Sequence, residues 1–315
     1  MNSSRLARRQ ALLGAAALPI AATVGGFAPT RVHAKADMKG AGPEQFSRFK
    51  LGSFEVTALM AGTRTVGAPQ EVFGVNVTPE EFAAASEAAF IPVDRAQFYF
   101  TPTVVNTGAE LVLFDTGLAP EGTVAALSAA GYTPDQVDVV VLTHMHPDHI
   151  GGMMTGDAAT FANARYVTGA IEHNHWMGAA NENFDKLVKP LNDKITMIDD
   201  AGAAASGITG MAAFGHTPGH MVYMVESDGQ RLAITADTAN HYIWSLAHPD
   251  WEVKFDADKP AAAAARKSVF GMLAADRVPF IGYHMPFPSL GYVEASGDGF
   301  RYVPASYQLI MGEPG

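Results

Sequence analysis

Residues 143–152 read Thr-His-Met-His-Pro-Asp-His-Ile-Gly-Gly and follow the apolar run Val-Val-Val-Leu at 139–142. His144, His146, Asp148 and His149 therefore fall within six residues at the end of an expected buried strand. Imidazole nitrogens and carboxylate oxygens are the usual ligands of a hydrolytic zinc-type ion, and a loop that leaves a strand can turn several of them toward one point. The segment predicts a metal site.

Three further candidate ligands lie downstream, each where an apolar run gives way to a loop: His216, Asp237 and His284. Together with the first segment they give five histidines and two aspartates, too many for one four-coordinate ion and enough for two. If Asp237 bridges the ions, each has about four protein ligands, and the pair shares a water or hydroxide. The sequence therefore predicts a dinuclear centre.

The order His-x-His-x-Asp-His at 144–149 resembles the signature of the metallo-β-lactamase fold superfamily, and every signature residue is present. The resemblance extends over nearly all of the chain after its leader. It implies that one metal is held by His144, His146 and His216, the other by Asp148, His149 and His284, with Asp237 between them. It also implies an α/β fold, the four-layer αββα sandwich.

The expected order of elements agrees with two sheets packed face to face with helices outside. The pattern predicts hairpins and strands at 46–50 with 54–59, 103–106 with 111–114, 137–142, 165–168, 195–198, 221–225 and 232–234. Helices are expected at 79–88, 122–130, 183–191 and 258–275, the last capped by Asp258.

Other polar residues near these strand ends are candidates for supporting the ligands. Asp115 lies in Leu-Val-Leu-Phe-Asp-Thr-Gly, and the resemblance implies that it supports a ligand, whereas its local sequence also suits a turn with Gly117. His220 and His241 each follow a candidate ligand by four residues: His220 is expected to support the ligand loop, and His241 to lie beside the second metal or on the pocket rim. His173 and His175 are expected in a solvated loop.

The first 34 residues read as a leader, and residues 35–315 as a single hydrolase domain. Arg8 and Arg9 precede an apolar stretch, and Val-His-Ala at 32–34 provides small residues for cleavage. The pair of arginines resembles a twin-arginine export signal, which predicts a periplasmic or secreted enzyme exported in the folded state. A membrane anchor is the alternative, but the apolar stretch is shorter than about 20 residues and is interrupted by Pro19.

Composition excludes several other functions. The chain has no cysteine, so neither a thiol nucleophile nor a cysteine ligand is available. Its net charge of -11 and the lack of a basic stripe argue against nucleic acid as a partner. Gly-x-Ser-x-Gly, Gly-x-Gly-x-x-Gly and phosphate-loop motifs are absent, which argues against a serine hydrolase and against dinucleotide or nucleotide cofactors.

The expected substrate is a small, largely apolar ester. Within the superfamily, Phe-Gly-His-Thr-Pro-Gly-His at 214–220 and Tyr-His-Met-Pro-Phe-Pro at 283–288 most resemble the methyl parathion hydrolase group, whose relatives hydrolyse lactones, aryl esters and organophosphate triesters. Such substrates need an aromatic pocket more than a cationic clamp. The candidate pocket residues are Phe98, Phe100, Trp176, Phe184 and Phe287.

Several alternatives remain open from the sequence alone. A lactonase acting on acyl-homoserine lactones or a β-lactamase would use the same ligands, whereas a glutathione thioesterase would need a helical domain after His284, where only 31 residues follow. Outside the enzymes, a periplasmic metal-binding protein is conceivable. Zinc is the expected ion, although the same donors accept manganese, iron or cobalt. No stable membrane insertion is expected, and a homodimer is suggested by family resemblance only.

Overall fold

Strand pairing in the computed structural model, which describes residues 44–307 and 309, gives two seven-stranded sheets and two short ribbons. The expected leader, residues 1–34, lies outside the described residues. The first sheet has the order β1-β2-β5-β6-β7-β10-β11. Its strands are β1 (Phe46–Leu51), β2 (Phe54–Leu59), β5 (Thr103–Asn106), β6 (Leu111–Phe114), β7 (Val139–Leu142), β10 (Arg165–Gly169) and β11 (Ile195–Ile198).

The second sheet runs β12-β13-β14-β15-β16-β17-β18. Its strands are β12 (Ala203–Ala205), β13 (Ile208–Ala212), β14 (Met221–Ser227), β15 (Gln230–Ala236), β16 (Phe280–Gly282), β17 (Leu290–Ser296) and β18 (Gly299–Pro304). The strands that precede His144, Asp237 and His284 lie in parallel pairs: β7 pairs with β6 and β10 in the first sheet, and β15 pairs with β16 in the second. Parallel pairing brings the carboxyl ends of these strands to one edge.

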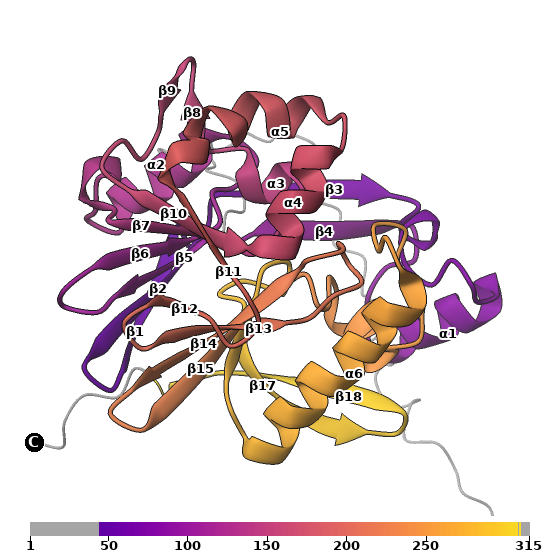
Figure 1. Ribbon diagram of the computed structural model, residues 1–315. Coiled ribbons are helices and arrows are strands. Elements are labelled where there is room, and N and C mark those ends of the chain that lie inside the picture. Colours follow the sequence, from indigo (N-terminus) through magenta and orange to yellow (C-terminus); the bar gives the residue numbers. More distant parts are fainter. Residues whose placement is uncertain (1–43, 308, 310–315) are drawn as a thin grey trace, which may run out of the picture. The chain divides into compact units, whose positions relative to one another are not determined.

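Three apolar layers hold the sheets and helices together. Between the sheets, the inner faces of both meet, as in Val141 and Val167 of the first sheet against Tyr223 and Ile234 of the second. Outside the first sheet lie α2 (Pro120–Ala129), α4 (Ala170–Gly178) and α5 (Glu182–Leu187), and outside the second lies α6 (Lys259–Asp276) (Figure 1). This is the expected four-layer αββα sandwich.

Local signals placed most helices correctly. Thr78 accepts a hydrogen bond from Glu81 N and starts α1 (Pro79–Ala88), and Asp258 accepts one from Ala261 N and starts α6. The expected helix at 183–191 instead divides into α5 and the 3-10 turn η3 (Lys189–Lys194), because Pro190 cannot donate a helical hydrogen bond. Within the described part of the chain, no helix is both long and apolar enough to cross a membrane.

A two-stranded ribbon and helix α4 are among the elements near the site that were not predicted. The strands β3 (Gly62–Gly67) and β4 (Arg95–Phe100) pair as a separate antiparallel ribbon, although 27 residues that include α1 separate them. The segment expected as a solvated loop is helix α4, in which His173 is buried and its Nε2 lies 2.6 Å from Asn192 Oδ1. His175 of the same helix is exposed, so only half of that expectation was correct.

Candidate metal centre

Strand ends deliver all seven candidate ligands to one place. His144 comes two residues after β7, and the one-turn helix α3 (Pro147–Ile150) carries Asp148 and His149. Asp237 follows β15, and His284 comes two residues after β16. These parallel strands and the loop after β13, which contains His216, meet between the two sheets. Side chains far apart in the sequence therefore converge on one cluster.

One group of donors consists of three histidines. The Nδ1 atom of His146 lies 3.1 Å from His144 Nε2 and 3.0 Å from His216 Nε2. Two ligand nitrogens on a tetrahedral zinc ion lie roughly 3.3 Å apart, given metal–nitrogen bonds of about 2.0 Å. The spacing of these three nitrogens therefore fits one shared ion.

The second group combines an imidazole pair with Asp148. The Oδ2 atom of Asp148 lies 3.3 Å from His284 Nε2 and 3.7 Å from His149 Nε2. Asp237 lies between the groups, because its Oδ2 is 3.3 Å from both His216 Nε2 and His284 Nε2, while its Oδ1 is 3.2 Å from His149 Nε2. The positions suit the predicted bridging role of Asp237.

Partners on the far side of four imidazole rings decide which nitrogen faces the cluster. His149 Nδ1 lies 2.8 Å from Asp115 Oδ2, His216 Nδ1 lies 2.9 Å from Asp256 Oδ1, and His284 Nδ1 lies 2.8 Å from the Tyr99 carbonyl. His144 Nδ1 lies 3.1 Å from Thr143 Oγ1, whose own proton is donated to Asp115 Oδ2. Each partner is an acceptor, so Nδ1 carries the proton and Nε2 presents a lone pair to the cluster.

The cluster is therefore a set of acceptors that face one another. Two of its buried atoms, His149 Nε2 and Asp237 Oδ1, have no hydrogen-bond partner among the described residues although they lie 3.2 Å apart. Buried lone pairs without donors are costly unless a cation lies between them. The residues present thus fit two divalent ions.

Both carboxylates of the cluster are ionised at neutral pH. Burial raises the pKa of Asp148, but His149 and His284 outweigh it and lower the pKa to about 2. The pKa of Asp237 is likewise held well below its usual range, because His284 and His149 outweigh the effect of burial. In the absence of a cation, Asp237 and Asp148 outweigh burial and raise the pKa of His284 to about 10. The cluster therefore favours positive charge.

Two of the three predicted supporting residues contact the cluster. Asp115 accepts hydrogen bonds from Thr143 N and Thr143 Oγ1 in addition to the one from His149. Its φ of 57° and the φ of 44° at Ala236, the residue before Asp237, lie in the left-handed region. Such strain is typical of functional sites held by their surroundings. His220 accepts a hydrogen bond from Asp237 N at Nε2 and donates from Nδ1 to the Ala213 carbonyl, so it is a neutral support.

Two further supports were missed by sequence reasoning. Asp256 joins His216 to Arg266, whose guanidinium is 1% exposed and donates to Asp256 Oδ2 at 3.0 Å. Glu172 is fully buried and connects two ligand loops, because its oxygens accept from Met145 N, Trp176 Nε1, Thr217 Oγ1 and Gly219 N. Neither carboxylate lies in a ligand motif, so no local pattern marked them.

Close backbone approach explains the glycines in and near the motif. A Cβ atom on Gly152 would lie 2.1 Å from the Thr116 carbonyl, and one on Gly219 would lie 2.1 Å from Glu172 N. Either contact would force the ligand loops apart. The absence of a side chain at Gly152 and Gly219 therefore lets the backbone at Thr116 and Glu172 pack directly against the ligand loops.

A cavity of about 280 Å³ opens onto the cluster and has mostly apolar walls. The predicted pocket residues Phe98 and Phe100 line it, beside His146, Asp148, Asp237 and His284. The remaining walls, which sequence reasoning missed, are Arg64, Val66, Leu118, Pro147 and Phe255. Most of them come from the β3–β4 ribbon and from loops whose positions depend on tertiary packing.

Three predicted pocket residues and one predicted support lie elsewhere. Phe184 is 1% exposed and packs in the core under α5, so its assignment to the pocket was wrong. Phe287 packs against the core between the sheets, and Trp176 lies edge-on to His146 with ring centroids 6.1 Å apart. His241 accepts from Ile243 N and Trp244 N, which places it at the start of the π-helical turn η4 (Tyr242–Ala247).

Comparisons with known proteins agree with this geometry. A family model described as the metallo-beta-lactamase superfamily matches residues 101–280. A structure of AidC, described as a dizinc quorum-quenching lactonase in complex with a product, is 26% identical with a TM-score of 0.77, covering 84% of this chain and 98% of that one. No match was found among curated protein sequences.

Two other solved structures share the fold. The hydrolase AbOPH, described as a member of the beta-lactamase superfamily, is 22% identical with a TM-score of 0.78, covering 85% of this chain and 100% of that one. A probable metal-dependent hydrolase from Staphylococcus aureus is 20% identical with a TM-score of 0.67, covering 81% and 98%. With the matched family model, the αββα layers and the clustered His and Asp donors, the chain belongs to the metallo-beta-lactamase superfamily.

Proposed function

We propose that the protein is a dinuclear metal-dependent hydrolase of small, largely apolar esters, chiefly lactones and aryl esters. The observation that carries the proposal is the apolar cavity of about 280 Å³ placed directly over Asp148, Asp237 and His284. It joins an aromatic binding surface to a cation-binding cluster. That combination suits a substrate with an uncharged body and one polar, hydrolysable bond.

When bound, two divalent ions would polarise a carbonyl oxygen and lower the pKa of coordinated water to about 7. Asp148 lines the cavity with its side chain 22% exposed, so its carboxylate can contact a substrate. With a pKa of about 2 it stays ionised, so a carboxylate oxygen can accept a hydrogen bond from an attacking water and orient it. Tyr283 donates its hydroxyl proton to the Asp148 carbonyl at 2.6 Å and thereby fixes this turn.

The walls favour an uncharged substrate. Phe98, Phe100 and Phe255 present rings to the cavity, and Arg64 is the single basic side chain on its wall besides the candidate ligands. The net charge of -11 disfavours the approach of anions. Arg64 can donate a hydrogen bond to an ester or lactone oxygen at the rim, so it contributes orientation rather than a charge match.

A substrate panel tests the proposal. Metal-reconstituted protein would be assayed on dihydrocoumarin, 4-nitrophenyl acetate, a phosphotriester and a β-lactam. We expect turnover of the lactone and the aryl ester, with kcat/KM lowered by Phe98→Ala and unchanged by Phe184→Leu, since Phe184 lies in the core. Stoichiometric metal without hydrolysis of any ester would instead favour a metal-binding protein.

A second candidate is the hydrolysis of acyl-homoserine lactones, which the 26% identity to the AidC lactonase favours. The same cavity would then hold an acyl chain against its aromatic walls. Butanoyl-, hexanoyl- and decanoyl-homoserine lactones would be compared. A kcat/KM that rises with the length of the acyl chain supports this substrate class. If all three homoserine lactones have a lower kcat/KM than dihydrocoumarin, acyl-homoserine lactones are ruled out as the preferred substrates.

We also propose export in the folded state, on the strength of Arg8 and Arg9 before the apolar stretch. Metal ligands drawn from distant parts of the chain can be assembled only after folding, which agrees with that route. Fractionation of cells that express the wild type and the Arg8→Lys, Arg9→Lys double variant tests it. Equal periplasmic amounts of both proteins would contradict the proposal.

A further inference from the structure

The β3–β4 ribbon separates the metal cavity from a second, larger cavity. Neighbouring side chains of a strand point to opposite faces. On one face Arg64 and Phe98, which are paired in register, line the cavity over the metal cluster. On the other face the next pair, Thr65 and Gln97, lines a cavity of about 500 Å³. One ribbon thus forms a wall of both cavities.

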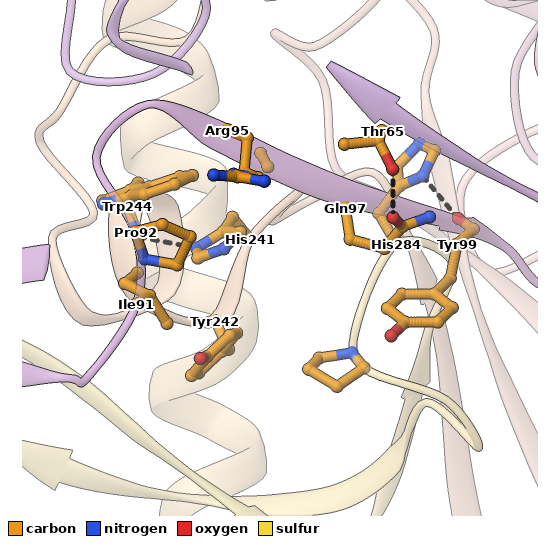
Figure 2. Close-up of a pocket in the computed structure, with 12 residues that line it drawn as sticks. Thr65, Ile91, Pro92, Arg95, Gln97, Tyr99, His241, Tyr242, Trp244 and His284 are labelled. Atoms are coloured by element: carbon orange, nitrogen blue, oxygen red, sulfur yellow. Dashed lines mark hydrogen bonds between the residues drawn. The ribbon is translucent and has the colours of Figure 1, made fainter. Parts of the chain in front are cut away.

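Aromatic rings make up much of the second cavity. Tyr99 of β4 lies on one side of it, and Tyr242 and His241 of the η4 segment lie on the other (Figure 2). Trp244 stacks on His241 with ring centroids 4.0 Å apart and planes inclined by 15°. The volume is within the range of small-molecule pockets, about 300–1,000 Å³. The walls offer flat surfaces for a ring-shaped molecule.

The half-buried histidine in this cavity, His241, is fixed as a hydrogen-bond donor. His241 Nδ1 accepts from Ile243 N at 3.1 Å and from Trp244 N at 3.2 Å, so Nδ1 carries no proton. In the neutral ring the proton must then lie on Nε2. Burial lowers the pKa of His241 to about 3, which keeps the ring neutral. The backbone of η4 thus sets a donor without charge in the cavity wall.

The other polar groups also favour an acceptor without charge. Burial and then the nearby Tyr99 raise the pKa of Tyr242, so the Tyr242 phenol remains protonated and can donate. Arg95 at the rim is paired with Asp94 at 3.1 Å, which offsets its charge. Gln97 is engaged with Thr65 Oγ1 at its side-chain oxygen. The cavity therefore offers aromatic surface and neutral donors, with little net charge to hold an ion.

We infer that this second cavity binds an uncharged aromatic molecule that carries a carbonyl-type hydrogen-bond acceptor. The ring lies against Tyr99, Tyr242 and His241, and the acceptor receives the His241 Nε2 proton. The inference does not rest on the proposed hydrolysis, because none of the donors reaches the metal cluster. His284 lines both cavities, but it turns Nε2 to the cluster and uses Nδ1 on the Tyr99 carbonyl.

The probe is acetophenone, an aromatic ketone with no hydrolysable bond, and binding to the metal-loaded protein is measured by ligand-observed NMR titration. His241→Asn keeps an oxygen for the two backbone N–H groups but lacks the ring Nε2–H, because the NH2 group of the shorter side chain does not extend to the Nε2 position, and Tyr242→Phe removes one hydroxyl. We expect His241→Asn to weaken binding about tenfold, the loss of one hydrogen bond. Tyr242→Phe should weaken it less, and the half-buried Tyr292→Phe on β17 is the matched control.

Phe98→Ala separates the two cavities, because Phe98 faces the metal cavity alone. Binding of acetophenone should survive this change, and benzoate should bind more weakly than acetophenone. Thermal unfolding of each variant checks that it is folded. The inference is overturned if acetophenone does not bind, if Tyr242→Phe and His241→Asn bind it as the wild type does, or if Phe98→Ala abolishes binding. Ester hydrolysis by the same variants reports separately on the proposed function.

Discussion

Histidines on the two sides of the β3–β4 ribbon differ in the partner of a single ring nitrogen. In the metal cluster, Nδ1 of His149, His216 and His284 meets an acceptor, so Nε2 presents a lone pair. In the second cavity, Nδ1 of His241 meets two backbone donors, so Nε2 presents a proton. The same kind of side chain, buried in the cluster and half-buried in the second cavity, therefore suits a cation in one and a carbonyl oxygen in the other.

The surroundings of each ring enforce this difference. Around the cluster lie the carboxylates Asp148 and Asp237, which favour positive charge. Around His241 lie phenols and an indole, and burial lowers its pKa to about 3. The nature of the outer partner, rather than the presence of histidine, is thus what assigns the chemistry.

The largest expected effect comes from removing the carboxylate of Asp237, which lies between the two groups of ligands. Asp237→Ala removes the carboxylate shared by both groups and leaves their imidazoles without a central anion. Metal content should fall below two ions per chain, and hydrolysis should fall by more than the roughly 10–100-fold that loss of an outer partner causes. Elemental analysis and steady-state kinetics measure the two effects. Full metal content with unchanged turnover would rule out a bridging Asp237.

A smaller effect should follow from altering an outer partner. Asp256→Asn replaces the carboxylate that accepts from His216 Nδ1 and pairs with Arg266. We expect metal affinity to fall about 10–100-fold, because an amide has one oxygen for two donors and must turn its NH2 group toward His216 or Arg266. Competition with a chelator measures the affinity. The exposed Asp250→Asn, which loses only an ion pair with Lys267, should bind metal as the wild type does.

Substitution of Glu172, which connects the ligand loops, should affect the stability of the protein more than its catalysis. Glu172→Gln replaces a buried carboxylate that accepts four hydrogen bonds with an amide that turns two donors toward other donors. The free energy of unfolding of the metal-free protein should fall by about 1–3 kcal/mol. Urea denaturation measures it, with the exposed Glu182→Gln as control. Equal losses in both variants would mean that Glu172 does not connect the loops.

The smallest effect concerns the neutral histidine of the second cavity. Because the folded pKa of His241 is about 3 and its unfolded pKa about 6.5, only the unfolded chain takes up this proton between those values. His241 therefore adds nothing to the pH dependence above pH 6.5 and lowers stability as the pH falls below it. Between pH 6 and 4, His241→Asn should lose stability less steeply than the wild type, by about 1 kcal/mol per pH unit. Parallel slopes would contradict a buried neutral His241.

Features encoded within a few residues were predictable. The His-x-His-x-Asp-His run, the cap Asp258, and the hairpins of the first sheet each follow from local spacing, and all appear in the structure. The convergence of His216, Asp237 and His284 followed from their places at strand ends together with the resemblance to the superfamily. The four layers followed from the alternation of strands and helices.

What depends on tertiary packing was not predictable. The β3–β4 ribbon joins strands with α1 between them, so no hairpin signal marks it. The sequence pattern around an aromatic residue in an amphipathic helix is the same whether the ring faces the core or a cavity, and Phe184 faces the core. Glu172 and Asp256 act through contacts of high sequence separation. The tautomer of His241 depends on the backbone of a π-helical turn that no pattern indicated.

The central claim is that the buried set of facing acceptors binds two divalent cations. Anomalous X-ray diffraction on crystals of the zinc-reconstituted protein, with data on both sides of the zinc absorption edge, tests it most directly. The account predicts two zinc peaks, one among His144, His146 and His216 and the other among Asp148, His149 and His284, with Asp237 contacting both. A fully folded protein with no peak there, or with a single peak away from Asp237, would contradict it.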